Sequence, residues 1–118
     1  MSATVTLFGN VTRDPELRFA GSTGNAWATF SVAVTHRKKK GDGYEEKTSF
    51  YDVVCFGAMA ENAAASLKKG TRVMVAGTLD LEEYEAKDGT KKISARVTAD
   101  ELGASVRFAN VEYHKVEK

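Results

Sequence analysis

The sequence holds very few residues of the kinds that build disulfides, metal sites and catalytic centres. Cys55 is the only cysteine, which excludes an intrachain disulfide, a cysteine zinc cluster and a CxxC redox pair; we expect it to be a small buried residue. The two histidines, His36 and His114, stand on separate segments with no carboxylate at a metal-ligand spacing. Glycine-rich phosphate loops are missing as well. We therefore expect no catalytic residues, no metal and no cofactor.

Long apolar runs are also missing. No stretch approaches the roughly 20 apolar residues that a membrane-spanning helix requires. The first four residues, Met1 to Thr4, lack the charged and apolar regions of a signal peptide. These features predict a cytoplasmic protein.

The balance of charge is nearly neutral, with a formal net charge of +1, so composition alone does not indicate a nucleic-acid binder. The charges are nevertheless uneven along the chain. Arg37 to Lys40 form a basic run, whereas Asp80, Glu82, Glu83 and Glu85 crowd a later segment. A basic run of this kind is either a solvated loop or a phosphate-binding element.

A period of two in the apolar residues predicts several strands on one domain that covers residues 1–118. The strands are expected at residues 4–11, 27–35, 48–56, 73–84 and 93–99. Two sets are expected to face the core: Ala28, Phe30, Val32 and Val34 on the second strand, and Val73, Val75, Gly77, Leu79 and Leu81 on the fourth.

Other segments connect these strands. Pro15 breaks the first alternation, since proline has no amide donor for a central ladder. Apolar residues at helical spacings between Gly57 and Gly70, in a segment rich in helix formers, predict the one helix. Gly41 to Gly43 and Asp88-Gly89 are typical of hairpin turns.

The order is therefore three strands, one helix and two or more strands. It predicts an all-β, five-stranded OB-fold barrel with one α-helix between strands three and four and with long hairpins. The final segment can supply an extra C-terminal strand through Val106, Phe108, Val111 and Tyr113. A doubly wound sheet does not fit, because no helices separate the first three strands.

Aromatic and basic residues alternate along these strands and hairpins. The aromatics are Phe50, Phe56 and Tyr84, and the basic residues are Arg37, Lys38, Lys39, Lys40, Lys91, Lys92 and Arg96. Single-strand binding needs this combination, because each base has a face to stack and each nucleotide has a phosphate to neutralise. Ordinary core aromatics would give a similar pattern.

A series of short motifs in order along the whole chain resembles the bacterial single-stranded DNA-binding proteins. The motifs are Leu7-Phe8-Gly9-Asn10, Asp14-Pro15-Glu16-Leu17-Arg18-Phe19 as a turn, Val53-Val54-Cys55-Phe56-Gly57, Ala60-Glu61-Asn62, Leu67-Lys68-Lys69-Gly70-Thr71-Arg72-Val73 and Gly77-Thr78-Leu79. The resemblance implies an OB fold that assembles as a homotetramer, wraps single-stranded DNA without regard to sequence, and acts in replication, recombination and repair at the nucleoid.

The resemblance also implies roles for individual residues. Phe50, Phe56 and Tyr84 fall where the family stacks bases, Arg18, Lys68 and Lys69 where it contacts phosphates, and Tyr51 at a subunit interface. The family has one more aromatic near Arg37 to Lys39, and this chain has none there.

Two further features depart from the family pattern. Asp52, Asp80, Glu82 and Glu83 stand where many members are basic, and acids beside a phosphate path repel it, which predicts weaker or more salt-sensitive binding. The family usually continues into a tail whose acidic tip recruits replication and repair proteins. This chain stops at Lys118, as a trimmed chain or a tailless paralogue would.

Two other functions compete with this interpretation. An OB-fold protein-interaction or primosome-like accessory module with weak DNA binding would use the aromatics for subunit contacts, and the acidic substitutions favour it slightly. A nuclease on the same scaffold would need clustered carboxylates or histidines around a metal, and the sequence shows none.

Overall fold

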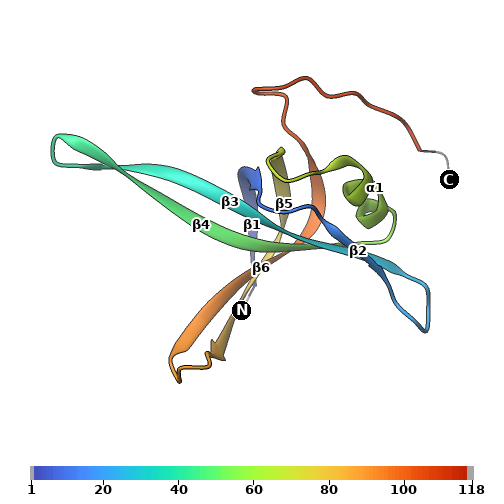
Figure 1. The fold of residues 1–118 in the computed structure, drawn as a ribbon, viewed down its shortest axis with the longest axis horizontal. Helices are drawn as coiled ribbons and strands as arrows, with labels where there is room; N and C mark the ends of the chain where they lie inside the picture. Colours follow the sequence, from blue (N-terminus) through green and yellow to red (C-terminus); the bar gives the residue numbers. More distant parts are fainter. Residues whose placement is uncertain (1, 117–118) are drawn as a thin grey trace.

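The computed structural model describes residues 2–116, which fold into six strands and one helix (Figure 1). The elements are β1 (Ser2–Val11), β2 (Glu16–Phe19), β3 (Ala26–Lys40), β4 (Gly43–Phe56), α1 (Ala58–Ser66), β5 (Arg72–Glu85) and β6 (Lys91–Ala104). Met1 and Lys118, which enter the expectations about the two chain ends, lie outside the described residues.

Five of the strands close into a barrel. The sheet order is β1-β5-β6-β4-β3-β2, and an additional pairing of β1 with β3 closes the ring and leaves β2 outside it. All neighbouring pairs are antiparallel except β4 with β6, which run parallel. The helix follows β4 and precedes β5, between the third and fourth barrel strands. The predicted OB-type barrel is confirmed.

The barrel interior is filled by the alternate side chains of each strand. Ala28, Phe30 and Val32 on β3 are 0% exposed, as the sequence predicts. Cys55 is also fully buried, and burial raises the pKa of its thiol while a backbone hydrogen bond with Ala28 opposes that shift. The core is therefore built from aliphatic side chains around Phe30.

Two glycines allow strands to approach closely where the ring closes and bends. A Cβ at Gly9 on β1 would collide with the Ala33 carbonyl of β3, and one at Gly77 on β5 would collide with the Thr98 carbonyl of β6. The register between β5 and β6 shifts at Ala76/Gly77. A glycine in a strand is typical of such a bulge.

Both long hairpins extend past the barrel as diverging arms (Figure 1). Strand pairing continues to Lys40 and Gly43 in the β3–β4 arm and to Glu85 and Lys91 in the β5–β6 arm. The prediction that Leu81 is buried is wrong, because its place on the arm has no core to cover it and the residue is 57% exposed.

The helix is shorter than predicted. It ends at Ser66, and Leu67 adopts an extended backbone that carries its side chain into the core. Lys68 to Thr71 then form a turn in which the Thr71 N–H donates to the Lys68 carbonyl at 3.0 Å. Lys68 and Lys69 thus lie beyond the helix rather than in its last turn.

Two expectations about strands need correction. The segment from Glu16 to Phe19, expected as a turn, is strand β2, because β3 extends far enough to pair with it. Residues 105–116, expected to add a C-terminal strand, contain no strand; the Ser105 N–H still donates to the Arg72 carbonyl of β5 at 2.8 Å, and the chain then leaves the sheet (Figure 1). A strand needs a neighbour for its backbone, and this single chain offers none there.

Candidate nucleic-acid interface

Residues directly opposite each other on paired strands point to the same face of the sheet. On β3 the residues between the core positions, Trp27, Thr29, Ser31 and Ala33, point away from the core. The opposite residues on β4 are Phe56, Val54, Asp52 and Phe50, in that order. We call this side of β2, β3, β4, β6 and β5 the outer face.

One row of the outer face joins a basic side chain to two aromatic rings. Arg18 on β2 is opposite Trp27 on β3, and Trp27 is opposite Phe56 on β4. Phe56 is 59% exposed. The row therefore presents a guanidinium group and an open aromatic ring on neighbouring strands.

The other two predicted stacking residues lie on the same face, one on each of the two long hairpins. Phe50 on β4 is opposite Ala33 and is 63% exposed. Tyr84 on β5 is opposite Lys92 on β6, and the ring is 48% exposed. Neither belongs to the core cluster. The alternative that these aromatics are core residues is wrong for all three, Phe56 included.

The row between the aromatic residues alternates in charge. Arg96 on β6 is opposite Asp52 on β4 and also opposite Asp80 on β5. Asp52 and Asp80 are thus the cross-strand neighbours of Arg96 on the two adjoining strands, and Glu82 lies one step further along the same face of β5. These acidic neighbours lower the positive electrostatic potential around Arg96.

The basic run is divided between the two faces of the β3–β4 arm. Arg37 and Lys39 continue the alternation of Trp27 and lie on the outer face, whereas Lys38 lies on the opposite face. Arg37 also forms an ion pair with Glu46 at 3.3 Å. Lys40, likewise on the opposite face, pairs with Glu45 at 3.5 Å.

The β5–β6 arm shows the same division. Lys92 lies beside Tyr84 on the outer face, but Lys91 lies on the reverse face and pairs with Glu83 at 3.7 Å. Of the four acids that depart from the family pattern, Glu83 is thus the one that points away from the outer face.

Lys68 and Lys69 lie in the turn after the helix, and Arg18 lies on β2. The Lys69 N–H donates to Asp14 Oδ1 at 2.8 Å, which ties the turn after the helix to the β1–β2 connection. Tyr51 differs from these residues, since it lies on the core side of β4 and packs against the core while partly exposed.

Two aromatics of the outer face, Trp27 and Tyr44, were not predicted as site residues from the sequence. Trp27, the only tryptophan, stands between Arg18 and Phe56, and its place in the polar half of the β3 alternation was the available signal. Tyr44 is opposite Lys39 and is 72% exposed, so the neighbouring strand places an aromatic ring beside the basic run, which itself contains none.

Within residues 2–116 the structure contains no cluster of three or more histidine, cysteine, aspartate or glutamate side chains able to hold a metal ion. No helix among these residues has the length and apolar character to cross a membrane.

Comparisons with known proteins agree on one family. A family model described as "Single-strand binding protein family" matches residues 2–105. The single-stranded DNA-binding protein of Paenarthrobacter aurescens is 40% identical over 118 residues, which cover 98% of this chain and 68% of that protein. The single-stranded DNA-binding protein of Mycolicibacterium smegmatis is 38% identical, and the match covers 98% of this chain and 71% of that protein.

A solved structure supports the same grouping. The crystal structure of a small single-stranded DNA-binding protein from Streptomyces coelicolor superimposes with a TM-score of 0.76 at 26% identity. The match covers 90% of this chain and 96% of that one.

Proposed function

The chain belongs to the single-strand binding protein family and therefore binds single-stranded DNA, and we propose that it does so on the outer face, by stacking bases on exposed aromatic rings. The observation that carries this proposal is the row of Arg18, Trp27 and Phe56 across three strands. It sets a phosphate-binding group beside rings that any base can stack on, so binding is independent of sequence.

The strand follows the outer face from β2 toward the two arms. Phe56, Phe50 and Tyr84 are its stacking positions, and Trp27 and Tyr44 add two rings. The residues that neutralise phosphates on this path are Arg18, Arg37, Lys39, Lys68, Lys69, Lys92 and Arg96. Lys38 and Lys91, on the reverse faces of the arms, contribute long-range attraction rather than contacts beside the rings.

Acidic residues on the outer face lower the affinity for DNA. Asp52 and Asp80 flank Arg96, and Arg37 is held by Glu46. Each carboxylate repels a phosphate or competes for a cation, so we expect weaker and more salt-sensitive binding than a face of uniformly basic residues would give.

Self-association is the second part of the proposal. Strand β1 pairs with β5 from Ser2 to Asn10, but β3 pairs with it only at Asn10 and Val11, so one edge is open among the described residues. An open edge is a template for another chain. Beside it lies a shallow hollow of about 410 Å³, lined by Phe8, Arg72, Met74, Ser105, Val106 and Arg107.

We propose that this surface helps to assemble a homotetramer, with Tyr51 at a second contact between subunits. Light scattering coupled to gel filtration should give four times the chain mass of 12.8 kDa. A monomer at micromolar concentration would contradict the assembly without affecting the DNA-binding proposal.

The remaining roles follow from the ligand. We propose that the described chain acts as one DNA-binding domain without catalytic activity, in the cytoplasm at the nucleoid, where replication, recombination and repair expose single strands. The proteins of those processes would be its partners in a full-length form that carries the family's acidic tail.

The experiment is a binding titration with labelled oligo-dT, with matched duplex DNA as the control, at two salt concentrations. We expect tight, salt-dependent binding to the single strand, and weaker binding by Phe50→Ala and by Tyr84→Ala. Equal affinity for the duplex would contradict the proposal and favour a protein-interaction module.

A further inference from the structure

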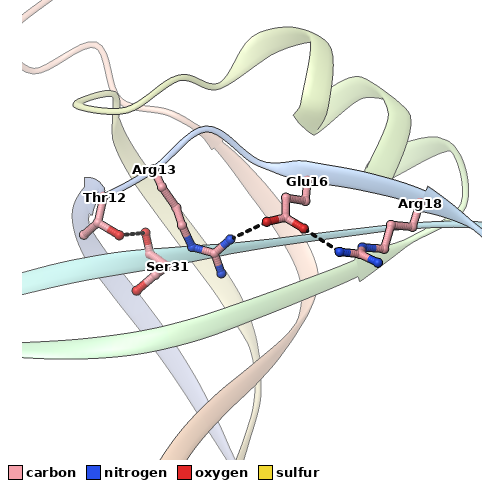
Figure 2. Close-up of polar contacts among 5 residues, drawn as sticks. All are labelled: Thr12, Arg13, Glu16, Arg18 and Ser31. Atoms are coloured by element: carbon pink, nitrogen blue, oxygen red, sulfur yellow. Dashed lines mark hydrogen bonds and ion pairs between the residues drawn. The ribbon is translucent and has the colours of Figure 1, made fainter.

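A single carboxylate holds two arginines together at the start of the outer face. Glu16 Oε2 accepts from Arg18 Nη2 at 2.9 Å, and Glu16 Oε1 accepts from Arg13 Nη1 at 3.3 Å (Figure 2). The side chains are 48%, 52% and 63% exposed for Arg13, Glu16 and Arg18. The two guanidinium groups converge on one anionic group in open solvent.

The backbone around this cluster is held at both ends. The Thr12 N–H donates to the Ser31 carbonyl at 2.9 Å. The Thr12 hydroxyl donates to the same carbonyl at 3.3 Å (Figure 2). Asp14 accepts the Lys69 N–H at 2.8 Å, and β2 pairs with β3 from Glu16 onward. The fold therefore positions Arg13 and Arg18 on either side of the same point.

That point lies beside the aromatic row. Arg18 is opposite Trp27, and Phe56 lies one strand further on. Two strand spacings are roughly 10 Å. A nucleotide stacked on Phe56 or Trp27 can place a phosphate of its backbone within reach of both guanidinium groups.

A carboxylate and a phosphate compete for the same donors of a guanidinium group. We propose that Arg13 and Arg18 together bind one phosphate of the DNA strand, a site that we call the two-arginine phosphate seat. In the free protein Glu16 occupies this seat, and the DNA phosphate displaces it on binding. Exposed ion pairs contribute little stability, so a phosphate held by neighbouring stacking contacts can displace the carboxylate.

Two consequences follow for residues that nothing else assigns to DNA. Arg13 becomes a DNA-binding residue, and Glu16 becomes an internal competitor that lowers affinity and keeps the two arginines in position. This inference rests on the proposed path of the strand over the outer face.

The test compares Arg13→Gln, Glu16→Gln and the double variant in titrations of labelled oligo-dT over a range of salt concentrations. The control is Glu112→Gln, which changes net charge equally but removes an exposed carboxylate that pairs with His114 at 3.6 Å on the C-terminal segment. Thermal unfolding of each variant shows whether the fold is retained, and Arg13→Lys supplies a charge-conserving variant.

We expect Arg13→Gln to weaken binding several-fold and to reduce the slope of log K against log salt by about 0.7, the value for one phosphate contact on a single strand. Arg13→Lys should keep the slope. Glu16→Gln should tighten binding several-fold beyond Glu112→Gln, and the double variant should lose most of that gain.

Two negative outcomes are distinguishable. If Arg13→Gln has the slope and affinity of the unaltered chain, and Glu16→Gln matches Glu112→Gln, while Phe50→Ala still weakens binding, the seat is wrong and the stacking face stands. If Phe50→Ala and Tyr84→Ala also bind like the unaltered chain, the proposed path itself is wrong.

Discussion

Removal of the Phe56 ring tests the stacking face most directly, because the ring has little to do with the stability of the barrel. Phe56 is 59% exposed and lies outside the core cluster. Base–aromatic stacking contributes about 1–3 kcal/mol per base. Trp27, opposite Phe56 on the neighbouring strand, remains in Phe56→Ala and keeps part of the stacking surface. We therefore expect a loss of about 1–2 kcal/mol, or a Kd about 5- to 30-fold higher.

The assay is fluorescence anisotropy of labelled oligo-dT, repeated over several salt concentrations. Phe56→Ala removes no charge, so the slope of log K against log salt should not change. The free energy of unfolding should change by no more than about 0.5 kcal/mol, as for other surface substitutions. Quenching of Trp27 fluorescence by DNA gives a second, unlabelled measurement in the parent chain.

Phe108→Ala provides the matched control. Phe108 is 76% exposed and stands between Arg72 and Arg107, with guanidinium carbons 5.5 and 5.3 Å from the ring centre. It is the same residue type beside basic groups, but it lies on the C-terminal segment, outside the row of Arg18, Trp27 and Phe56. If Phe56→Ala and Phe108→Ala give the same Kd, the assignment of stacking to the outer face is refuted.

Three further outcomes are expected. Gly77→Ala should cost about 1–3 kcal/mol of unfolding free energy, because its Cβ has no room against the β6 backbone, whereas Gly43→Ala, with open space, should be nearly neutral in thermal unfolding. Burial raises the pKa of the Cys55 thiol, so the thiol should resist a disulfide reagent until denaturant is added. The unfolding free energy should also fall as pH rises past the ordinary thiol range, because the thiol of the unfolded chain ionises first. Rapid labelling of the native protein would contradict this expectation. Asp80→Asn should lower the Kd for oligo-dT about two- to threefold, the effect of removing a carboxylate about 7 Å from a phosphate in water; an unchanged Kd would place the strand away from Arg96.

Local patterns in the sequence were enough to predict the barrel and most of its core. The alternation on β3 correctly identified Phe30 and Val32 as inward residues, since successive side chains of a strand point to opposite faces. The same parity placed Phe50 and Phe56 together on one face of β4. Resemblance to the family supplied the functional meaning of that face.

Local patterns could not show how far the inward face of a strand stays covered. Leu81 has the parity of a core residue, but the arm carries it beyond the barrel and leaves it 57% exposed. Likewise, the segment from Glu16 to Phe19 becomes a strand only because β3 extends alongside it.

The composition of the candidate site depended on the tertiary structure in the same way. The register between strands set Trp27 between Arg18 and Phe56, and placed Asp52 and Asp80 on both sides of Arg96. The sequence by itself determined which residues each strand presents to each face, because that follows from a local period of two. Only the folded chain decided which side chains become neighbours, because strand pairing joins residues far apart in sequence.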